Sequence, residues 1–192
     1  MIFENLFFFL EIGAVFLAVA YLLLAVRRDI RCWIAGIMSS SIYFVLMFTA
    51  NLYMESILQI FYIFMGVYGF NQWKSDIANT EEISITTWNL KTHLIVLGII
   101  FISSYFAGYI LDTYTDAKLP FLDSLTTFGA LFATYMVAKK ILENWIYWFL
   151  IDSVSIYLFI ERELYLTSIL FCLYLIIIIF GFRSWLAVFR AG

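Results

Sequence analysis

Seven stretches of mostly apolar residues follow one another along the chain, separated by short polar segments. A transmembrane helix needs about 20 largely apolar residues, with a range of roughly 17–25. Irregular backbone cannot satisfy its hydrogen bonds in lipid, so each stretch is expected to be helical. The pattern predicts an all-α membrane protein with seven transmembrane helices. The predicted spans lie near Leu10–Val26, Trp33–Thr49, Ser56–Gln72, Leu94–Leu111, Phe121–Ala138, Trp145–Ile160 and Tyr165–Phe182.

The composition supports this prediction, because 65% of the residues are hydrophobic and only 13% are charged. Soluble domains are typically about half apolar and about a quarter charged. Residues 1–192 are therefore expected to form one integral membrane domain. The N-terminal stretch carries Glu4 rather than an early basic residue and lacks a small-residue cleavage pattern, so it predicts a retained span rather than a signal peptide.

The basic residues are distributed unevenly between the two sets of loops. One set contains Lys118 and Arg162, whereas the other contains most of the arginines and lysines. Basic loops stay in the cytoplasm, so we expect the N-terminus outside and the C-terminus inside. The predicted cytoplasmic residues are Arg27, Arg28, Arg31, Lys74, Lys91, Lys139, Lys140, Arg183 and Arg190.

The first three spans repeat in the last three at a shift of 112 positions without a gap. This predicts repeats over residues 10–73 and 121–185, joined by a linker helix over residues 93–111. A single linker span gives both repeats the same orientation, and parallel repeats occur in transporters. The matches include Trp33 with Trp145, Tyr62 with Tyr174, Gly69 with Gly181 and Trp73 with Trp185.

The repeats differ at several polar and aromatic positions, which indicates one asymmetric substrate site rather than a symmetric channel. The differing pairs include Asn144 with Cys32, Trp148 with Gly36, Asp152 with Ser40, Gln59 with Phe171 and Asn71 with Arg183.

Asp152 lies near the middle of its predicted span and shares a helical face with Asn144 and Trp148. A charged side chain inside a membrane is costly and commonly functional, so Asp152 is a candidate counter-charge for a cation or a proton site. A hydrogen-bonded packing role is the alternative. Trp148 can stack on a flat cation. Trp145 is a second binding candidate, but its repeat in Trp33 equally favours an interfacial anchor.

Further candidates lie on the third span. Gln59 and Tyr62 share one face, where Gln59 can bind substrate or join two helices. Tyr62 repeats as Tyr174, which slightly favours packing. Asn71 and Gln72 are candidates for an inner gate, although a solvated helix end is the simpler interpretation.

Several functional classes find no support in the sequence. It has neither a GxxxxGK[ST] loop nor a Ser/His/Asp or HExxH arrangement, so we expect no enzyme activity. His93 is the single histidine, and Cys32 and Cys172 fall in or beside apolar segments, so no metal, disulfide or cofactor is predicted. The expected partners are a lipid bilayer and a small molecule, and no nucleic acid. Homo-oligomer formation stays open.

Two groups of motifs resemble the PnuC family of vitamin transporters, and together they cover nearly the whole chain. The second half contains ENWIYW–x3–D–x–VS–x–Y, LYLTSILF and GFRSW, and the first half contains LYMESILQIFY and YGFNQW. The resemblance implies a 3+1+3 fold like that of a full-length SWEET transporter. Trp145 and Trp148 match the family's tryptophan pair, and Gln59 matches a glutamine associated with the riboside carriers. Asp152 stands where many relatives are expected to have an asparagine.

The resemblance implies facilitated diffusion of nicotinamide riboside across the bacterial inner membrane, with trapping by a cytoplasmic vitamin kinase. Thiamine is the close alternative, because relatives carry it. A carboxylate at position 152 suits the cationic ring of either vitamin, and it can also pair with the aminopyrimidine of thiamine. A sugar-type facilitator and a non-transporting membrane subunit are the competing classes.

Overall fold

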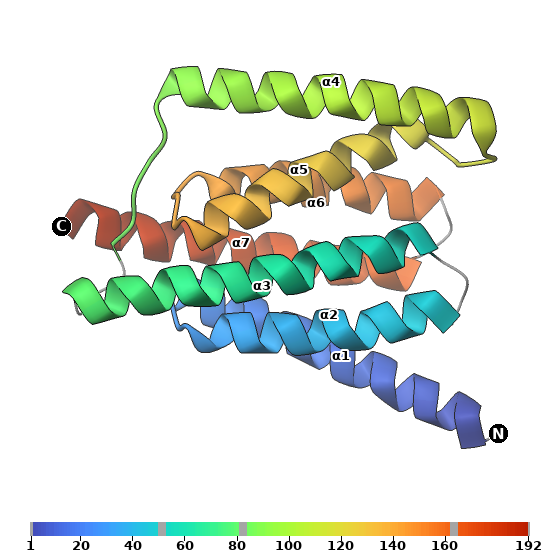
Figure 1. Ribbon diagram of the computed structural model, residues 1–192, viewed down its shortest axis with the longest axis horizontal. Coiled ribbons are helices and arrows are strands. Elements are labelled where there is room, and N and C mark those ends of the chain that lie inside the picture. Colours follow the sequence, from blue (N-terminus) through green and yellow to red (C-terminus); the bar gives the residue numbers. More distant parts are fainter. Residues whose placement is uncertain (1, 50–52, 81–83, 162–164, 192) are drawn as a thin grey trace. The chain divides into compact units, whose positions relative to one another are not determined.

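The computed structural model is all-helical over the residues it describes, which are 2–49, 53–80, 84–161 and 165–191 (Figure 1). Seven helices lie in this part of the chain, in agreement with the predicted number. Arg162 lies outside the described residues. The helices are α1 (Ile2–Val26), α2 (Arg31–Thr49), α3 (Tyr53–Thr80), α4 (Leu90–Tyr114), α5 (Pro120–Ala138), α6 (Asn144–Glu161) and α7 (Tyr165–Ala191).

Local signals in the sequence account for several helix starts. Asn89 caps α4, since its Oδ1 accepts a hydrogen bond of 2.8 Å from the backbone N–H of Thr92. Pro120 is the first residue of α5, where its missing N–H costs no helical hydrogen bond. Both α3 and α7 continue past their predicted ends at Gln72 and Phe182, because hydropathy locates the apolar part of a helix and not its hydrogen-bonded end.

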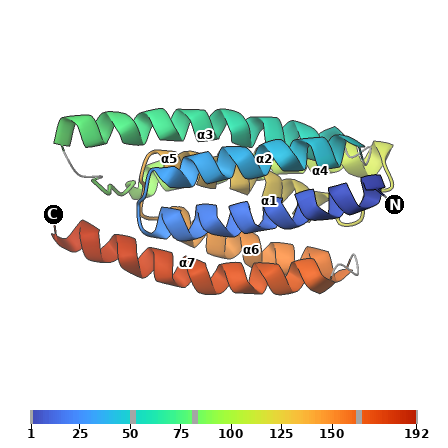
Figure 2. The same cartoon turned by 90° about the horizontal axis from the view of Figure 1, so that it is seen from below.

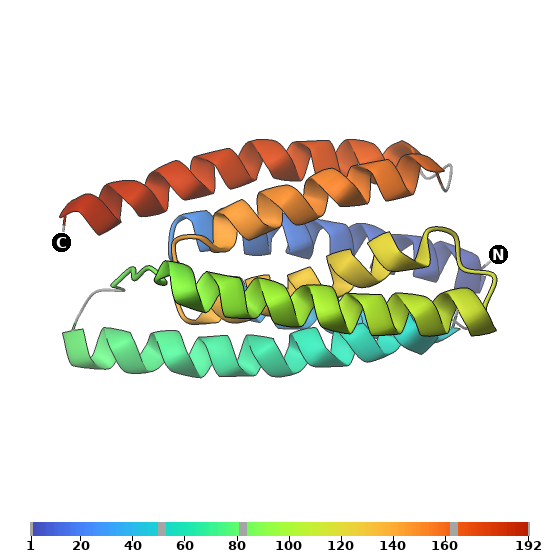
Figure 3. The ribbon, with the colours of Figure 1, turned by 90° about the horizontal axis from the view of Figure 1, so that it is seen from above.

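The chain divides into two compact units, Met1–Ser84 and Ile85–Gly192. In the first unit, α2 packs against both α1 and α3, as Figure 2 shows. In the second unit the helices pack in chain order, α4 on α5, α5 on α6 and α6 on α7 (Figure 3). The predicted linker helix α4 thus packs on the helix that follows it.

Within the part of the chain that the structure describes, five helices contain segments long and apolar enough to cross a membrane: Phe7–Val26, Arg31–Thr49, Leu90–Tyr114, Pro120–Ala138 and Thr167–Ala191. The other two, α3 with 28 residues and α6 with 18, contain no such segment among the described residues. These two helices also contain the candidate substrate residues.

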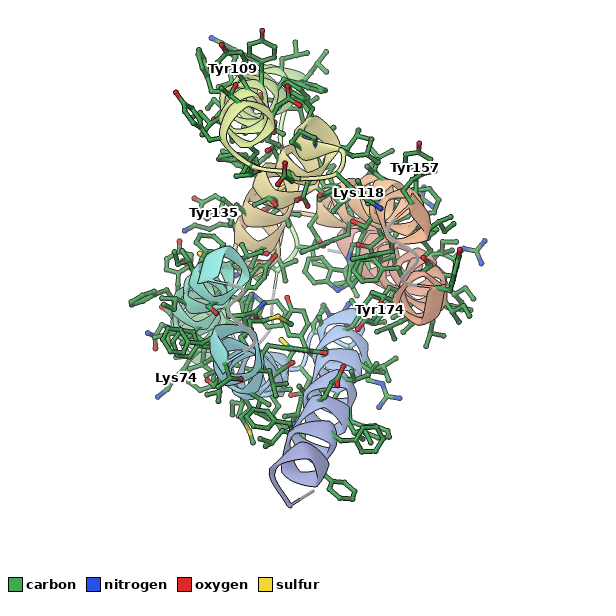
Figure 4. The ribbon with its side chains drawn as sticks, turned by 90° about the vertical axis from the view of Figure 1, so that its right-hand side faces the viewer. Lys74, Tyr109, Lys118, Tyr135, Tyr157 and Tyr174 are labelled. Atoms are coloured by element: carbon green, nitrogen blue, oxygen red, sulfur yellow. The ribbon has the colours of Figure 1, made fainter. Side chains whose placement is uncertain are left out.

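Large apolar side chains cover the outer surface of the helices. On α4, Phe101, Ile102 and Phe106 are all exposed, and Tyr109 is 56% exposed and points away from the helices (Figure 4). Soluble monomers rarely expose continuous apolar patches of more than a few hundred Å². This surface is consistent with helices that face lipid.

A buried pair of tryptophan rings occurs at the same repeat positions in each unit. Trp33 and Trp73 lie 5.5 Å apart between ring centroids at an interplanar angle of 85°. Trp145 and Trp185 lie 5.5 Å apart at 86°. All four indoles are almost fully buried, so each pair is part of the packing of its own unit.

The turns before α2 and α6 also have matching backbone geometry. Arg28 and Lys140 both adopt φ 57°, and each donates a 3.0 Å hydrogen bond, to the carbonyls of Ala25 and Val137 respectively. A positive φ is uncommon for residues other than glycine. Its occurrence at both positions supports the sequence repeat at the level of local structure.

Candidate functional site

The start of α6 is held by the turn before it and by the segment that precedes α4. The N–H of Thr86 donates to the carbonyl of Lys140 at 3.1 Å, and the N–H of Leu142 donates to the carbonyl of Thr86 at 2.8 Å. These two hydrogen bonds fix the backbone two residues before the first candidate substrate residue. The second unit therefore positions the start of α6 through backbone contacts.

Asn144, Trp148 and Asp152 fall on one face of α6, as predicted. Successive residues turn by about 100° around a helix, so these three lie within about 80° of one another. Asn144 is fully buried, Asp152 is 4% exposed and Trp148 is half-buried. We call these three residues the polar face of α6.

The polar face contains hydrogen-bonding capacity that the described residues do not use. Asn144 donates from Nδ2 to the carbonyl of Ile141 at 2.6 Å, while its Oδ1 is buried and has no partner among the described residues. Within the described part of the second unit, no basic side chain forms an ion pair with Asp152. Buried polar groups are normally paired. A ligand with a donor group and positive charge would match both residues.

Trp145 has different surroundings from Trp148. It is 1% exposed and packs edge-to-face on Trp185 of α7. A Cβ added at Gly181 would lie 2.5 Å from the Trp145 ring, so α7 approaches this indole as closely as a glycine permits. These contacts place Trp145 in the packing between α6 and α7.

The other predicted site residues lie on α3 in the first unit. Gln59 and Tyr62 are half-buried, on the same face as Gly66, where an added Cβ would lie 2.5 Å from Ile37. Of the two candidate gate residues, Asn71 is exposed and Gln72 is half-buried. The helix continues to Thr80, so neither residue lies at its end.

A second polar cluster, beside the start of α6, was not predicted. It involves His93 of α4, Tyr147 of α6, and Trp88 and Glu143 from the segments before these helices. His93 Nδ1 lies 3.0 Å from the Tyr147 hydroxyl, and His93 Nε2 lies 3.9 Å from Glu143 Oε1. The backbone N–H of Trp88 donates to Glu143 Oε2 at 3.4 Å. The sequence alone did not indicate this cluster, because nothing in the local pattern connects residues more than 50 positions apart.

Comparison with known proteins identifies the family. The family model described as "Nicotinamide mononucleotide transporter" matches residues 8–187. The chain belongs to this family. The resemblance to the PnuC vitamin transporters is thereby confirmed, and the protein is a membrane transporter.

Individual relatives agree with this assignment. The nicotinamide riboside transporters PnuC of Escherichia coli and Shigella flexneri are each 22% identical over 189 residues, covering 85% of this chain and 79% of the relative. A crystal structure of the vitamin B3 transporter PnuC superposes with a TM-score of 0.74 at 19% identity, covering 95% of this chain and 83% of that one. The helices thus form a PnuC-like fold.

Proposed function

We propose that this protein takes up nicotinamide riboside by facilitated diffusion, with the N-terminus outside and the C-terminus in the cytoplasm. The observation that carries this proposal is the buried carboxylate of Asp152, one turn from Trp148 on the polar face of α6. Nicotinamide riboside contains a flat pyridinium ring with a positive charge. Trp148 would stack on the ring, Asp152 would supply the counter-charge, and Asn144 Oδ1 would accept a hydrogen bond.

The charges at the candidate residues favour a riboside over a mononucleotide. The family description names a mononucleotide, whereas the relatives are named for the riboside. A phosphate group is usually bound by arginine, lysine or backbone N–H groups. The candidate residues Asn144, Trp145, Trp148, Asp152, Gln59 and Tyr62 include no basic side chain and one acid, which would repel a phosphate.

We further propose a 3+1+3 arrangement of seven spans, in which two parallel three-helix bundles carry different polar residues and so form one asymmetric substrate site. The matching tryptophan pairs and turns of the two units support the repeat. The polar face does not repeat, because Gly36 and Ser40 stand in place of Trp148 and Asp152. Under this proposal, Gln59 and Tyr62 are the candidate substrate residues of the first bundle.

Trapping of the product by a cytoplasmic kinase would make uptake directional without ion coupling. The sequence has no nucleotide-binding loop to drive transport. Proteoliposomes test this directly, because uptake of labelled nicotinamide riboside should follow the vitamin gradient alone. A requirement for a proton or sodium gradient would contradict facilitated diffusion.

Calorimetry on the purified protein tests the substrate. We expect nicotinamide riboside to bind at least as tightly as millimolar, about 4 kcal/mol, and nicotinamide mononucleotide to bind more weakly. Thiamine is the second candidate, favoured by the carboxylate of Asp152, and tighter binding of thiamine would reassign the substrate. Binding of neither vitamin, with binding of a neutral sugar instead, would refute the proposal.

A further inference from the structure

An apolar groove runs between α6 and α7 on the outer surface of the second unit. It has a volume of about 210 Å³, and its lining includes Trp145, Ile146, Phe149, Ile179 and Arg183. Trp145 forms part of its buried floor, whereas Ile146 and Ile179 on its walls are 47% and 43% exposed. At about 100° per residue, Ile146 and Phe149 are turned roughly 160° and 100° from Trp148 at the middle of the polar face of α6. The groove thus lies on another side of α6 from the polar face, and Trp145 is the one candidate substrate residue in its lining.

Arg183 is the charged residue in this lining, and no acidic side chain is among the described residues that form the groove. It is exposed and follows Tyr165, the first residue of α7, by 18 positions. At 1.5 Å per residue, the helix rises roughly 27 Å between them. The hydrocarbon core of a bilayer is about 30 Å thick. Arg183 would thus lie at the depth where acyl chains meet phosphate groups.

The sequence repeat shows that this charge is particular to the second bundle. The position equivalent to Arg183 is Asn71, while the apolar positions Ile146 and Ile179 correspond to Ile34 and Val67. The apolar character is retained in both repeats, and the charge is not. The first repeat consequently supplies control positions with similar apolar surroundings and no arginine.

From these observations we propose that the groove binds an anionic phospholipid of the cytoplasmic leaflet. An acyl chain would lie along Ile146, Phe149 and Ile179, and the lipid phosphate would accept hydrogen bonds from the Arg183 guanidinium. Guanidinium groups bind phosphate in a fork geometry, and basic pockets between transmembrane helices bind anionic head groups. The assignment to the cytoplasmic leaflet depends on the orientation of the chain given under the proposed function. The existence of the groove does not depend on that orientation.

Native mass spectrometry on the detergent-purified full chain tests the site in the absence of vitamin. With equal phosphatidylglycerol and phosphatidylcholine, the wild type should retain phosphatidylglycerol about fivefold more, since one basic residue near the membrane contributes about that factor. Arg183→Gln should remove the preference. Arg190→Gln removes an equal charge from the same helix outside the groove, and this variant should retain the preference for phosphatidylglycerol. Equal losses in both variants, or no preference in the wild type, would overturn the proposal.

A second pair of variants tests the groove without changing charge. Ile179→Trp should fill it and reduce lipid retention severalfold, whereas Val67→Trp at the equivalent exposed position of α3 should not. Equal lipid retention in these two variants would refute the groove as the binding site. This test remains decisive even if Arg183→Gln fails to fold. Displacement of the lipid by inorganic phosphate at similar concentration would show a free-anion site instead. Because no vitamin is present in these experiments, a negative result for lipid binding leaves the transport proposal intact. A negative result for vitamin transport likewise leaves the lipid proposal intact.

Discussion

The indole of Trp145 packs directly on Gly181, where an added Cβ would lie 2.5 Å from the ring. Trp33 and Gly69 have the same relationship in the first unit, at 2.4 Å. Each contact lets two consecutive helices approach closely, because glycine lacks the atom that would collide. The contacts occur at equivalent repeat positions and involve ring atoms that have little room to move.

Gly181→Ala should lower the stability of the protein, because the new methyl group would force the buried Trp145 ring to shift. Overpacking of this kind typically costs about 1–3 kcal/mol. Thermal unfolding in detergent measures the effect. Gly98→Ala is the matched control, since no atom lies within 4 Å of its added Cβ, and it should be neutral or slightly stabilising. Equal melting temperatures for the two variants would contradict close packing at Gly181.

Asp152→Asn should weaken binding of nicotinamide riboside at least tenfold, about 1.4 kcal/mol, if the carboxylate is the counter-charge of the ring. Calorimetry measures this affinity. Glu161→Gln removes an exposed acid from the same helix and should leave it unchanged. Unchanged affinity together with lower thermal stability in Asp152→Asn would instead assign Asp152 to packing.

Substitution of the two α6 tryptophans should separate binding from packing. Trp148→Ala should reduce vitamin affinity by tenfold or more with a small effect on melting temperature, because this ring is half-buried on the polar face. Trp145→Ala should reduce stability by about 3–5 kcal/mol, as for other fully buried aromatic residues. Calorimetry and thermal unfolding of both variants provide the comparison. The reverse pattern would place the substrate on Trp145.

The hydrogen bond between His93 and Tyr147 should couple α4 to the start of α6. In a double-mutant cycle with His93→Phe and Tyr147→Phe, the coupling energy should be about 0.5–1.5 kcal/mol, the net value of a typical hydrogen bond. Denaturant or thermal unfolding of the four proteins supplies the cycle. Additive effects of the two substitutions would show that the contact contributes nothing to stability.

The proposed orientation can be measured with single cysteines in a background lacking Cys32 and Cys172. A cysteine in place of Lys118 should react with a membrane-impermeant maleimide in intact cells, because the loop after α4 is expected outside. A cysteine in place of Ala191 should react only after the cells are opened. Labelling of both positions in opened cells provides the control, and the opposite pattern would invert the topology.

The sequence by itself determined the helical class, the number of helices among the described residues and the resemblance to PnuC. Long apolar stretches have one stable backbone solution in lipid, so these features depend on local composition. The internal sequence repeat and the positions at which its two halves differ could also be recognised from the sequence, because matching residues follow in the same order in both halves. The common face of Asn144, Trp148 and Asp152 followed from helical periodicity alone.

The tertiary structure decided which residues of other helices contact the side chains of α6 outside its polar face. Trp145 and Trp148 have the same residue type and lie three positions apart, but only the packing of α7 shows that Trp145 lies against Gly181 and Trp185. His93 meets Tyr147 only because the first turns of α4 and α6 come together in the folded second unit. Periodicity reports which residues share a face of one helix, whereas the neighbour of that face depends on how separate helices pack.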